Sequence, residues 1–146
     1  MENINFFKGK GGFTLLEIVM VVAIIAVLAI LSFNSLSYAR ITGRDTRRVA
    51  DISTIRSALN LYYLQTGSYP TAITPGNSLL RGSTIILEEI PSNPTPRADN
   101  GCADKDYDYA QISGGISYTL SFCLGYPQED ISGGAHVAIP EGILPN

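Results

Sequence analysis

Residues 12–33 read GFTLLEIVMVVAIIAVLAILSF, an almost unbroken apolar stretch. Three residues interrupt its apolar run, which extends from Phe13 to Phe33: Thr14, Glu17 and Ser32. At about 1.5 Å per residue, a helix of this length spans about 31 Å, close to the roughly 30 Å hydrocarbon core of a bilayer. A helix in a soluble core would show polar residues at the helical period, and Ile18 to Leu31 shows none. The stretch therefore predicts a membrane-spanning helix.

Glu17 places one carboxylate near the start of this apolar run. Such a group in a membrane-spanning helix costs roughly 2.5 to 3.5 kcal/mol at the helix centre and less near an end, so it needs a partner. The next basic residue is Arg40, about 34 Å farther along a helix. We therefore expect the partner to come from another molecule. The alternative is that Glu17 lies close enough to the membrane interface to stay hydrated.

A glycine-rich segment, KGKGG at residues 8–12, precedes the apolar run. A secretory signal peptide instead has an apolar run of about 7 to 15 residues with a small-residue cleavage site after it. The contiguous stretch Gly12–Glu17, GFTLLE, strongly resembles the leader junction of type IV pilins and type II secretion pseudopilins. The segment Tyr62–Pro70, YYLQTGSYP, also resembles the major pseudopilins, which are therefore the most similar group.

The resemblance implies how the N-terminus is processed and used. Residues 1–12 would be a leader that a prepilin peptidase removes between Gly12 and Phe13, and Phe13 would then be N-methylated. Gly12 suits the junction because a residue without Cβ enters a protease cleft at little steric cost. The amine of Phe13 on a neighbouring subunit would be the partner of Glu17 and would fix the axial register during assembly.

The helical pattern continues beyond residue 33 and predicts an amphipathic second helix half over residues 34–66. One stripe of residues recurs at spacings of three and four: Val49, Ile52, Ile55, Leu59, Tyr62 and Thr66. Gly67 suits a left-handed helix end, and Pro70 prevents continuation of the helix. We expect the stripe to pack against the rest of the chain.

One dense basic cluster lies in this helix half: Arg40, Arg44, Arg47 and Arg48. We interpret it as a solvated face with local ion pairs to Asp45 and Asp51; the alternatives are contacts with lipid headgroups or with acidic neighbours in a filament. By the positive-inside rule the cluster outweighs Lys8 and Lys10 and would place the C-terminal half in the cytoplasm. The leader motif and the cysteine pair favour the opposite orientation, which we adopt.

From residue 67 to 146, glycine and proline become frequent and apolar runs become short, which predicts a globular head with a small antiparallel sheet. The alternation from Ile116 to Leu124 is the clearest strand. Residues 107–112 and 135–139 are weaker candidates, and residues 84–90 fit either a strand or a short helix. The predicted fold class is α+β: a long N-terminal helix, its first half (residues 13–33) transmembrane, packed on this sheet.

Cys102 and Cys123 are the two cysteines of the chain. An even count in an exported domain indicates a disulfide, and two free thiols are the alternative. By the chain-entropy estimate, such a bridge would stabilise the head by about 3 kcal/mol.

Three alternating aspartates also lie in the head: Asp104, Asp106 and Asp108. They do not form an EF-hand, because Tyr109 and Gly115 stand where that loop requires glycine and glutamate. Major pseudopilins hold a structural calcium in a C-terminal loop, so the resemblance makes a calcium site using some of these residues one interpretation. Asp99, Glu129 and Asp130 are further candidate ligands. A solvated acidic loop is the other interpretation.

We predict neither an enzyme nor a nucleic-acid partner. His136 is the single histidine and lies in a glycine-rich stretch, where we interpret it as a surface or packing residue. The serines show neither a Gly-x-Ser-x-Gly nor a Ser-x-x-Lys pattern. A net charge of -3 and a pI near 5.0 argue against a basic nucleic-acid-binding face.

The resulting prediction is a structural subunit of a type IV pilus-like filament, most similar to a type II secretion pseudopilus for protein export. One alternative is a type IV pilin for adhesion, motility or DNA uptake; another is a monomeric, membrane-anchored extracellular binding module. Expected partners are further copies, a prepilin peptidase, an inner-membrane assembly platform and, before assembly, membrane lipid. We expect a single-pass protein of the cytoplasmic membrane with its head outside the cytoplasm, and then a periplasmic or cell-surface filament.

Overall fold

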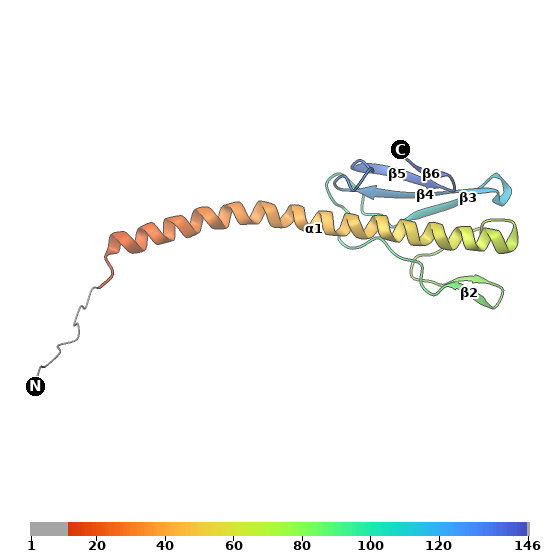
Figure 1. The fold of residues 1–146 in the computed structure, drawn as a ribbon, viewed down its shortest axis with the longest axis horizontal. Coiled ribbons are helices and arrows are strands. Elements are labelled where there is room, and N and C mark those ends of the chain that lie inside the picture. The colour runs from red at the N-terminus through yellow and green to blue at the C-terminus, as the bar shows by residue number, and fades with distance from the viewer. Residues whose placement is uncertain (1–11, 146) are drawn as a thin grey trace, which may run out of the picture. The chain divides into compact units, whose positions relative to one another are not determined.

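The fold consists of one long helix followed by six short strands (Figure 1). A computed structural model describes residues 12–145, without the side chains of residues 31–34. The elements are α1 (Leu15–Thr66), β1 (Leu79–Arg81), β2 (Thr84–Leu87), β3 (Asp108–Ile112), the 3₁₀ turn η1 (Ser113–Gly115), β4 (Ser117–Leu124), β5 (Gly134–Ile139) and β6 (Gly142–Pro145). The predicted α+β class, with a long N-terminal helix and a small antiparallel sheet, is confirmed.

Helix α1 ends where the sequence predicts. Gly67 adopts a φ of 76°, and its N–H donates to the Tyr63 carbonyl over 2.8 Å. A left-handed backbone conformation costs little for glycine, and the chain leaves the helix here, before Pro70. The ring of Tyr69 stacks on Tyr63 with a centroid separation of 4.7 Å, so aromatic packing closes the helix end.

The chain divides into two compact units, Met1–Ser37 and Tyr38–Asn146. In the first unit, every large apolar residue described from Phe13 to Ile30 is between 48% and 85% exposed. This part of α1 is long and apolar enough to cross a membrane. The exposure matches the prediction that this helix half is covered by lipid or by other molecules rather than by its own chain.

The second unit has three layers, with α1 in the middle. A four-stranded antiparallel sheet in the order β3-β4-β5-β6 lies on one side of the helix, and the antiparallel β1–β2 hairpin lies on the other (Figure 1). The inner face of the sheet and one stripe of α1 form the core, which includes Ile52, Ile55, Leu59, Tyr118, Leu120 and Leu124. The predicted stripe is therefore confirmed from Val49 to Tyr62, with Val49 and Tyr62 partly buried against the core, whereas Thr66 at its end is exposed.

Four of the six strands follow the sequence patterns. β4 is the strand predicted over residues 116–124, and β3 and β5 match the weaker candidates. Residues 84–87 form a strand, which decides between the two interpretations of that segment. β1 and β6 were not predicted: they have three and four residues and show no alternation of apolar and polar residues.

A disulfide joins Cys102 to Cys123, as predicted, with a Cα–Cα distance of 5.7 Å. It links the irregular segment of residues 91–107 to β4. Cys123 lies on the outer face of β4, because its neighbours Phe122 and Leu124 are buried on the inner face.

Candidate functional site

The N-terminal candidate site is the start of α1. The Thr14 hydroxyl accepts a hydrogen bond from the Glu17 N–H over 3.2 Å, so Thr14 caps the helix. Thr14 and Glu17 have the spacing of a capping box, in which an acidic residue three positions after the cap supports the helix start. The capping role of Thr14 was not predicted, although the T-x-x-E pattern is visible in the sequence.

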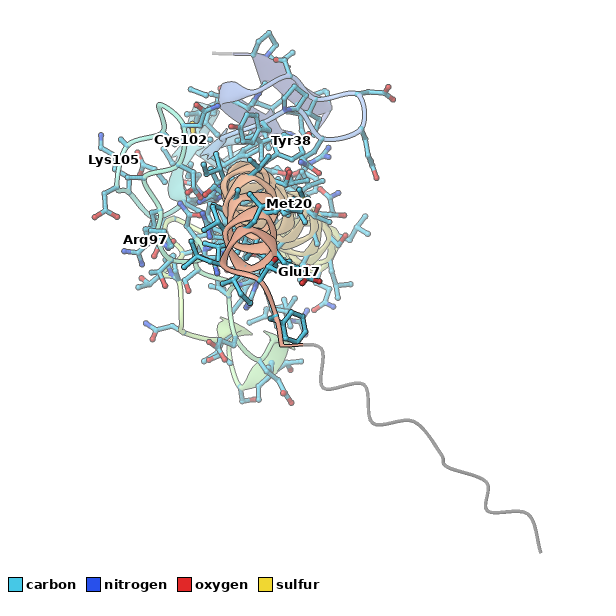
Figure 2. All side chains as sticks on the ribbon, turned by 90° about the vertical axis from the view of Figure 1, so that its left-hand side faces the viewer. Glu17, Met20, Tyr38, Arg97, Cys102 and Lys105 are labelled. Carbon is cyan, nitrogen blue, oxygen red and sulfur yellow. A yellow bond between two sulfur atoms is a disulfide. The ribbon has the colours of Figure 1, made fainter. Side chains whose placement is uncertain are left out.

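Glu17 is an isolated charge on an apolar surface. Glu17 is exposed, and none of the ion pairs among the described residues includes it. Figure 2 labels Glu17 and Met20 on this part of the helix. A carboxylate in the first turn is favoured by the helix dipole, which contributes about 0.3 to 1 kcal/mol at an exposed site. The dipole accounts for tolerance of the charge in water, but not for its presence in a segment suited to lipid.

Comparison with protein families gives one match. The model of the prokaryotic N-terminal methylation motif matches residues 7–33. The chain carries a type IV pilin-like prepilin signal. This pilin-like signal begins before the part of the chain that the structure describes, so residues 1–11 of the predicted leader lie outside the described residues. Comparisons with curated proteins and with solved structures found no match.

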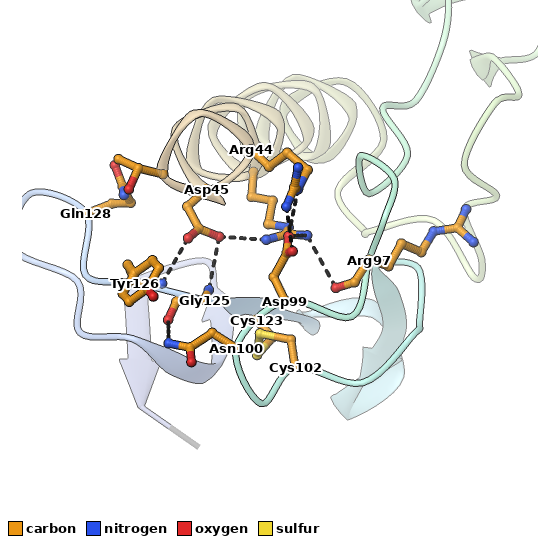
Figure 3. A network of polar contacts seen from close by, with 12 residues as sticks. Arg44, Asp45, Arg97, Asp99, Asn100, Cys102, Cys123, Gly125, Tyr126 and Gln128 are labelled. Carbon is orange, nitrogen blue, oxygen red and sulfur yellow. Dashed lines mark hydrogen bonds and ion pairs between the residues drawn. A yellow bond between two sulfur atoms is a disulfide. The ribbon is translucent and has the colours of Figure 1, made fainter. Parts of the chain in front are cut away.

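The second candidate site is a buried ion cluster, which we call the clamp. It consists of Arg44, Asp45, Arg48 and Asp99 (Figure 3). Arg48 and Asp45 are fully buried, and Asp99 is 4% exposed. The interpretation of the arginine cluster as a solvated face is therefore wrong for Arg48, which is buried, although its predicted local ion pair with Asp45 is present. Arg44 is half-buried and pairs with Asp99.

Arg48 is the centre of the clamp. Its guanidinium donates to the Asp45 carboxylate over 2.6 Å and to Asp99 over 2.9 Å. It also donates to the Asn93 side-chain oxygen and to the backbone carbonyls of Pro96 and Arg97. A buried charge is tolerated when it is paired and its remaining hydrogens have acceptors. Arg48 meets this condition by binding the segment 93–99 to α1.

Asp45 binds a different part of the chain. Its carboxylate accepts hydrogen bonds from the backbone N–H groups of Gly125 and Tyr126, over 3.0 and 2.9 Å. Gly125 is required here, because a Cβ at this position would lie 2.7 Å from a methyl group of Ile41. The end of β4 is thus held against the helix at a place where no side chain fits.

Asp99 forms ion pairs with both arginines. Arg44 donates to it through two nitrogens, over 2.7 and 2.6 Å. The hydrogen bond from Arg44 lowers the pKa of the Asp99 carboxyl, burial opposes this effect, and Arg48 adds to the lowering. The two arginines and two aspartates balance in charge, which reduces the cost of burying them.

The sequence contained a signal for the clamp. Asp45, Arg48, Ile52, Ile55 and Leu59 follow one another at spacings of three and four, so the two charged residues continue the buried stripe. The predicted stripe begins at Val49, which does pack against the core, but the buried face also includes Arg48 and Asp45. Arginine is rarely found on a buried face. The partner Asp99 is 51 residues from Arg48, and no local pattern predicts such a contact.

A third buried carboxylate, that of Asp51, lies one turn farther along α1 than Arg48. Asp51 is 9% exposed and accepts a hydrogen bond from the Tyr107 hydroxyl over 2.9 Å. Burial raises the pKa of Asp51, although the bond from Tyr107 and the charge of Arg47 lower it. Burial and the neighbouring Asp51 raise the pKa of Tyr107. The Tyr107 hydroxyl therefore stays protonated and donates a hydrogen bond to the Asp51 carboxylate.

The three alternating aspartates are not brought together as a cation site. Asp106 accepts hydrogen bonds from the backbone of Asn93 and Tyr107 and pairs with Arg97 over 2.9 Å. Asp104 and Asp108 are exposed. Within residues 12–145, no group of three or more histidine, cysteine, aspartate or glutamate side chains is placed to hold a metal ion. These residues do not fit calcium as they stand, and the calcium site stays a prediction.

His136 is a packing residue, one of the two roles that we expected. It is 3% exposed, and its ring lies 5.5 Å from that of Phe122 between centroids. Its Nε2 forms a hydrogen bond with the Ser132 carbonyl over 2.7 Å. The imidazole thus joins β5 to the preceding loop inside the second unit.

Proposed function

We propose that this chain is a structural subunit of a type IV pilus-like filament, rooted in a membrane before assembly. The observation that carries the proposal is Glu17, a lone carboxylate in an exposed apolar helix segment that lies within a prepilin signal. A protein that only needed an anchor would gain nothing from a charge there, because the charge opposes insertion. A filament subunit gains an assembly contact.

In this proposal, a prepilin peptidase cuts between Gly12 and Phe13 and exposes the Phe13 amine, which is methylated. The amine of one subunit then neutralises Glu17 of a neighbour. The two groups occupy different places on the subunit, so the contact is heterologous and adds further copies without closing a ring. The exposed apolar residues from Leu15 to Ile30 pack between subunits once they leave the lipid.

Two kinds of filament fit this chemistry. The resemblance over Gly12–Pro70 favours a type II secretion pseudopilus, extended by an inner-membrane assembly platform during protein export. The Cys102–Cys123 disulfide favours a type IV pilin for adhesion, motility or DNA uptake, because a disulfide in the head is more typical of those proteins. We take the pseudopilus as the first candidate, because its resemblance extends over more of the chain.

The charge of Glu17 can be removed without removing the helix cap. Glu17→Gln keeps a side chain that a capping box accepts, and Met20→Leu is the control on the same helix segment. We expect Glu17→Gln to insert into membranes like wild type but to lose filament assembly, measured by in-cell cross-linking and by recovery of sheared filaments. Met20→Leu should assemble normally.

Normal assembly of Glu17→Gln would contradict the proposed contact. Absence of assembly in the wild-type chain, when it is produced together with a prepilin peptidase and an assembly platform, would favour the monomeric anchor instead.

A further inference from the structure

The clamp contacts the chain on both sides of the disulfide. Asp99, which receives Arg44 and Arg48, lies three residues before Cys102, and the Cys102 N–H donates to the Asp99 carbonyl over 2.9 Å. Gly125 and Tyr126, which donate to Asp45, lie two and three residues after Cys123. Cys102 therefore lies near a clamp residue, and Cys123 lies near two residues that are hydrogen-bonded to the clamp.

The two anchored segments are also joined directly. The Asn100 side-chain amide donates to the Gly125 carbonyl over 2.7 Å. The Arg48–Asp45 pair on α1 connects the contacts on one side with those on the other (Figure 3). None of these contacts uses a sulfur atom, so all of them can form while both cysteines are thiols.

We propose that the clamp is a template for the disulfide: it brings Cys102 and Cys123 together in the reduced chain, before they are joined. The clamp belongs to the buried surface of α1, next to Ile52, and forms when the sheet packs on the helix. Because a buried pair is costly unless every partner is present, the clamp forms completely or not at all. Once formed, it fixes the segments on both sides of the bridge.

The chemistry needs an oxidant, and an external disulfide such as oxidised glutathione supplies it. One protein thiolate attacks the external disulfide, forms a mixed disulfide and releases one glutathione thiolate. The second protein thiolate then attacks the protein sulfur of the mixed disulfide, closes the bridge and releases the second glutathione. Two protein thiols are oxidised, and one glutathione disulfide is reduced to two thiols. The template acts on the second step, which depends on the effective concentration of one cysteine at the other.

Re-oxidation of the reduced full-length chain in detergent tests this inference. We compare Asp99→Ala, which removes a clamp residue, with Asp104→Ala, which removes an exposed carboxylate two residues from Cys102. Both changes remove one carboxylate that lies within three residues of Cys102, but only Asp99 belongs to the clamp. With oxidised glutathione and thiol alkylation followed by mass analysis, we expect ring closure to be roughly tenfold slower in Asp99→Ala. Asp104→Ala should match wild type.

A second variant keeps the inference testable if Asp99→Ala does not fold. In Cys102→Ser/Cys123→Ser all four clamp residues are present and no bridge can form. We expect this variant to keep a folded head, with the backbone N–H groups of Gly125 and Tyr126 protected from hydrogen exchange. Loss of this protection, or equal closure rates for Asp99→Ala and wild type, would overturn the proposal. Neither result depends on filament assembly, so the proposed function is tested separately.

Discussion

Arg48 is the residue on which the head depends most. It is fully buried, and its removal would leave Asp45 and Asp99 without their common partner. Removing one member of a buried ion cluster costs about 3 to 5 kcal/mol because the remaining charges stay buried. We therefore expect Arg48→Met to lower the free energy of unfolding by about this amount, measured by denaturant titration.

The neighbouring Arg47 provides the control for Arg48. It is exposed and has the same side chain on the same helix. Arg47→Met should change the free energy of unfolding by less than about 0.5 kcal/mol. Similar losses for both variants would show that the buried contacts of Arg48 are not what stabilises the head.

The contribution of Asp51 to the stability of the folded chain is expected to depend on pH. Burial raises its pKa in the folded chain above the ordinary value of 3.8, so the folded state holds this proton more tightly than the unfolded state. The contribution of Asp51 to stability therefore falls as pH rises from about 3.8 through the raised pKa. Asp51→Asn removes this dependence and keeps an acceptor for Tyr107. We expect its stability relative to wild type to increase across that pH range, measured by urea titrations at several pH values.

Asp99 has the opposite pH dependence, which allows the two carboxylates to be distinguished. Its pKa is lowered in the folded chain, so its contribution is complete above the ordinary value of 3.8 and is lost as pH falls through the lowered pKa. The relative stability of Asp51→Asn therefore changes on the less acidic side of 3.8, where Asp99 is already ionised. A flat difference over that range would contradict the buried state of Asp51.

At the scale of elements, those with a local sequence signal were predicted, whereas those that depend on long-range contacts were not. Helix α1 was predicted with its end at Thr66, because apolar spacing, Gly67 and Pro70 are all local. β4 was predicted from its alternation over eight residues. The short strands β1 and β6 carried no such pattern, and they exist because neighbouring strands supply their hydrogen bonds.

The candidate sites also differ in whether a local sequence signal predicts them. The Gly12–Glu17 motif, which includes Glu17, consists of six consecutive residues, so the sequence alone predicts it. The clamp joins α1 to segments about 50 and 80 residues away, and it could not be predicted beyond the hint that Arg48 follows the buried stripe. Tertiary packing buries Arg48, leaves Arg44 half-buried and leaves Arg40 and Arg47 exposed.

At the scale of the whole molecule, the chain combines a unit with its own core and a helix segment without one. Residues 38–146 bury Leu59, Tyr118 and Leu120 completely, whereas the large apolar residues described from Phe13 to Ile30 are all exposed. An exposed apolar surface of this extent marks an interaction site. Membrane lipid before assembly and further copies afterwards are the two environments that the proposed function provides.

The central claim is that the exposed helix segment becomes an assembly element when the leader is removed and the Phe13 amine is freed. Intact-mass analysis of the chain, recovered from membranes of cells with a prepilin peptidase, tests this claim most directly. We predict a species that begins at Phe13 and carries one N-methyl group. A species that still begins at Met1, unmethylated, in the presence of the active peptidase would contradict the claim.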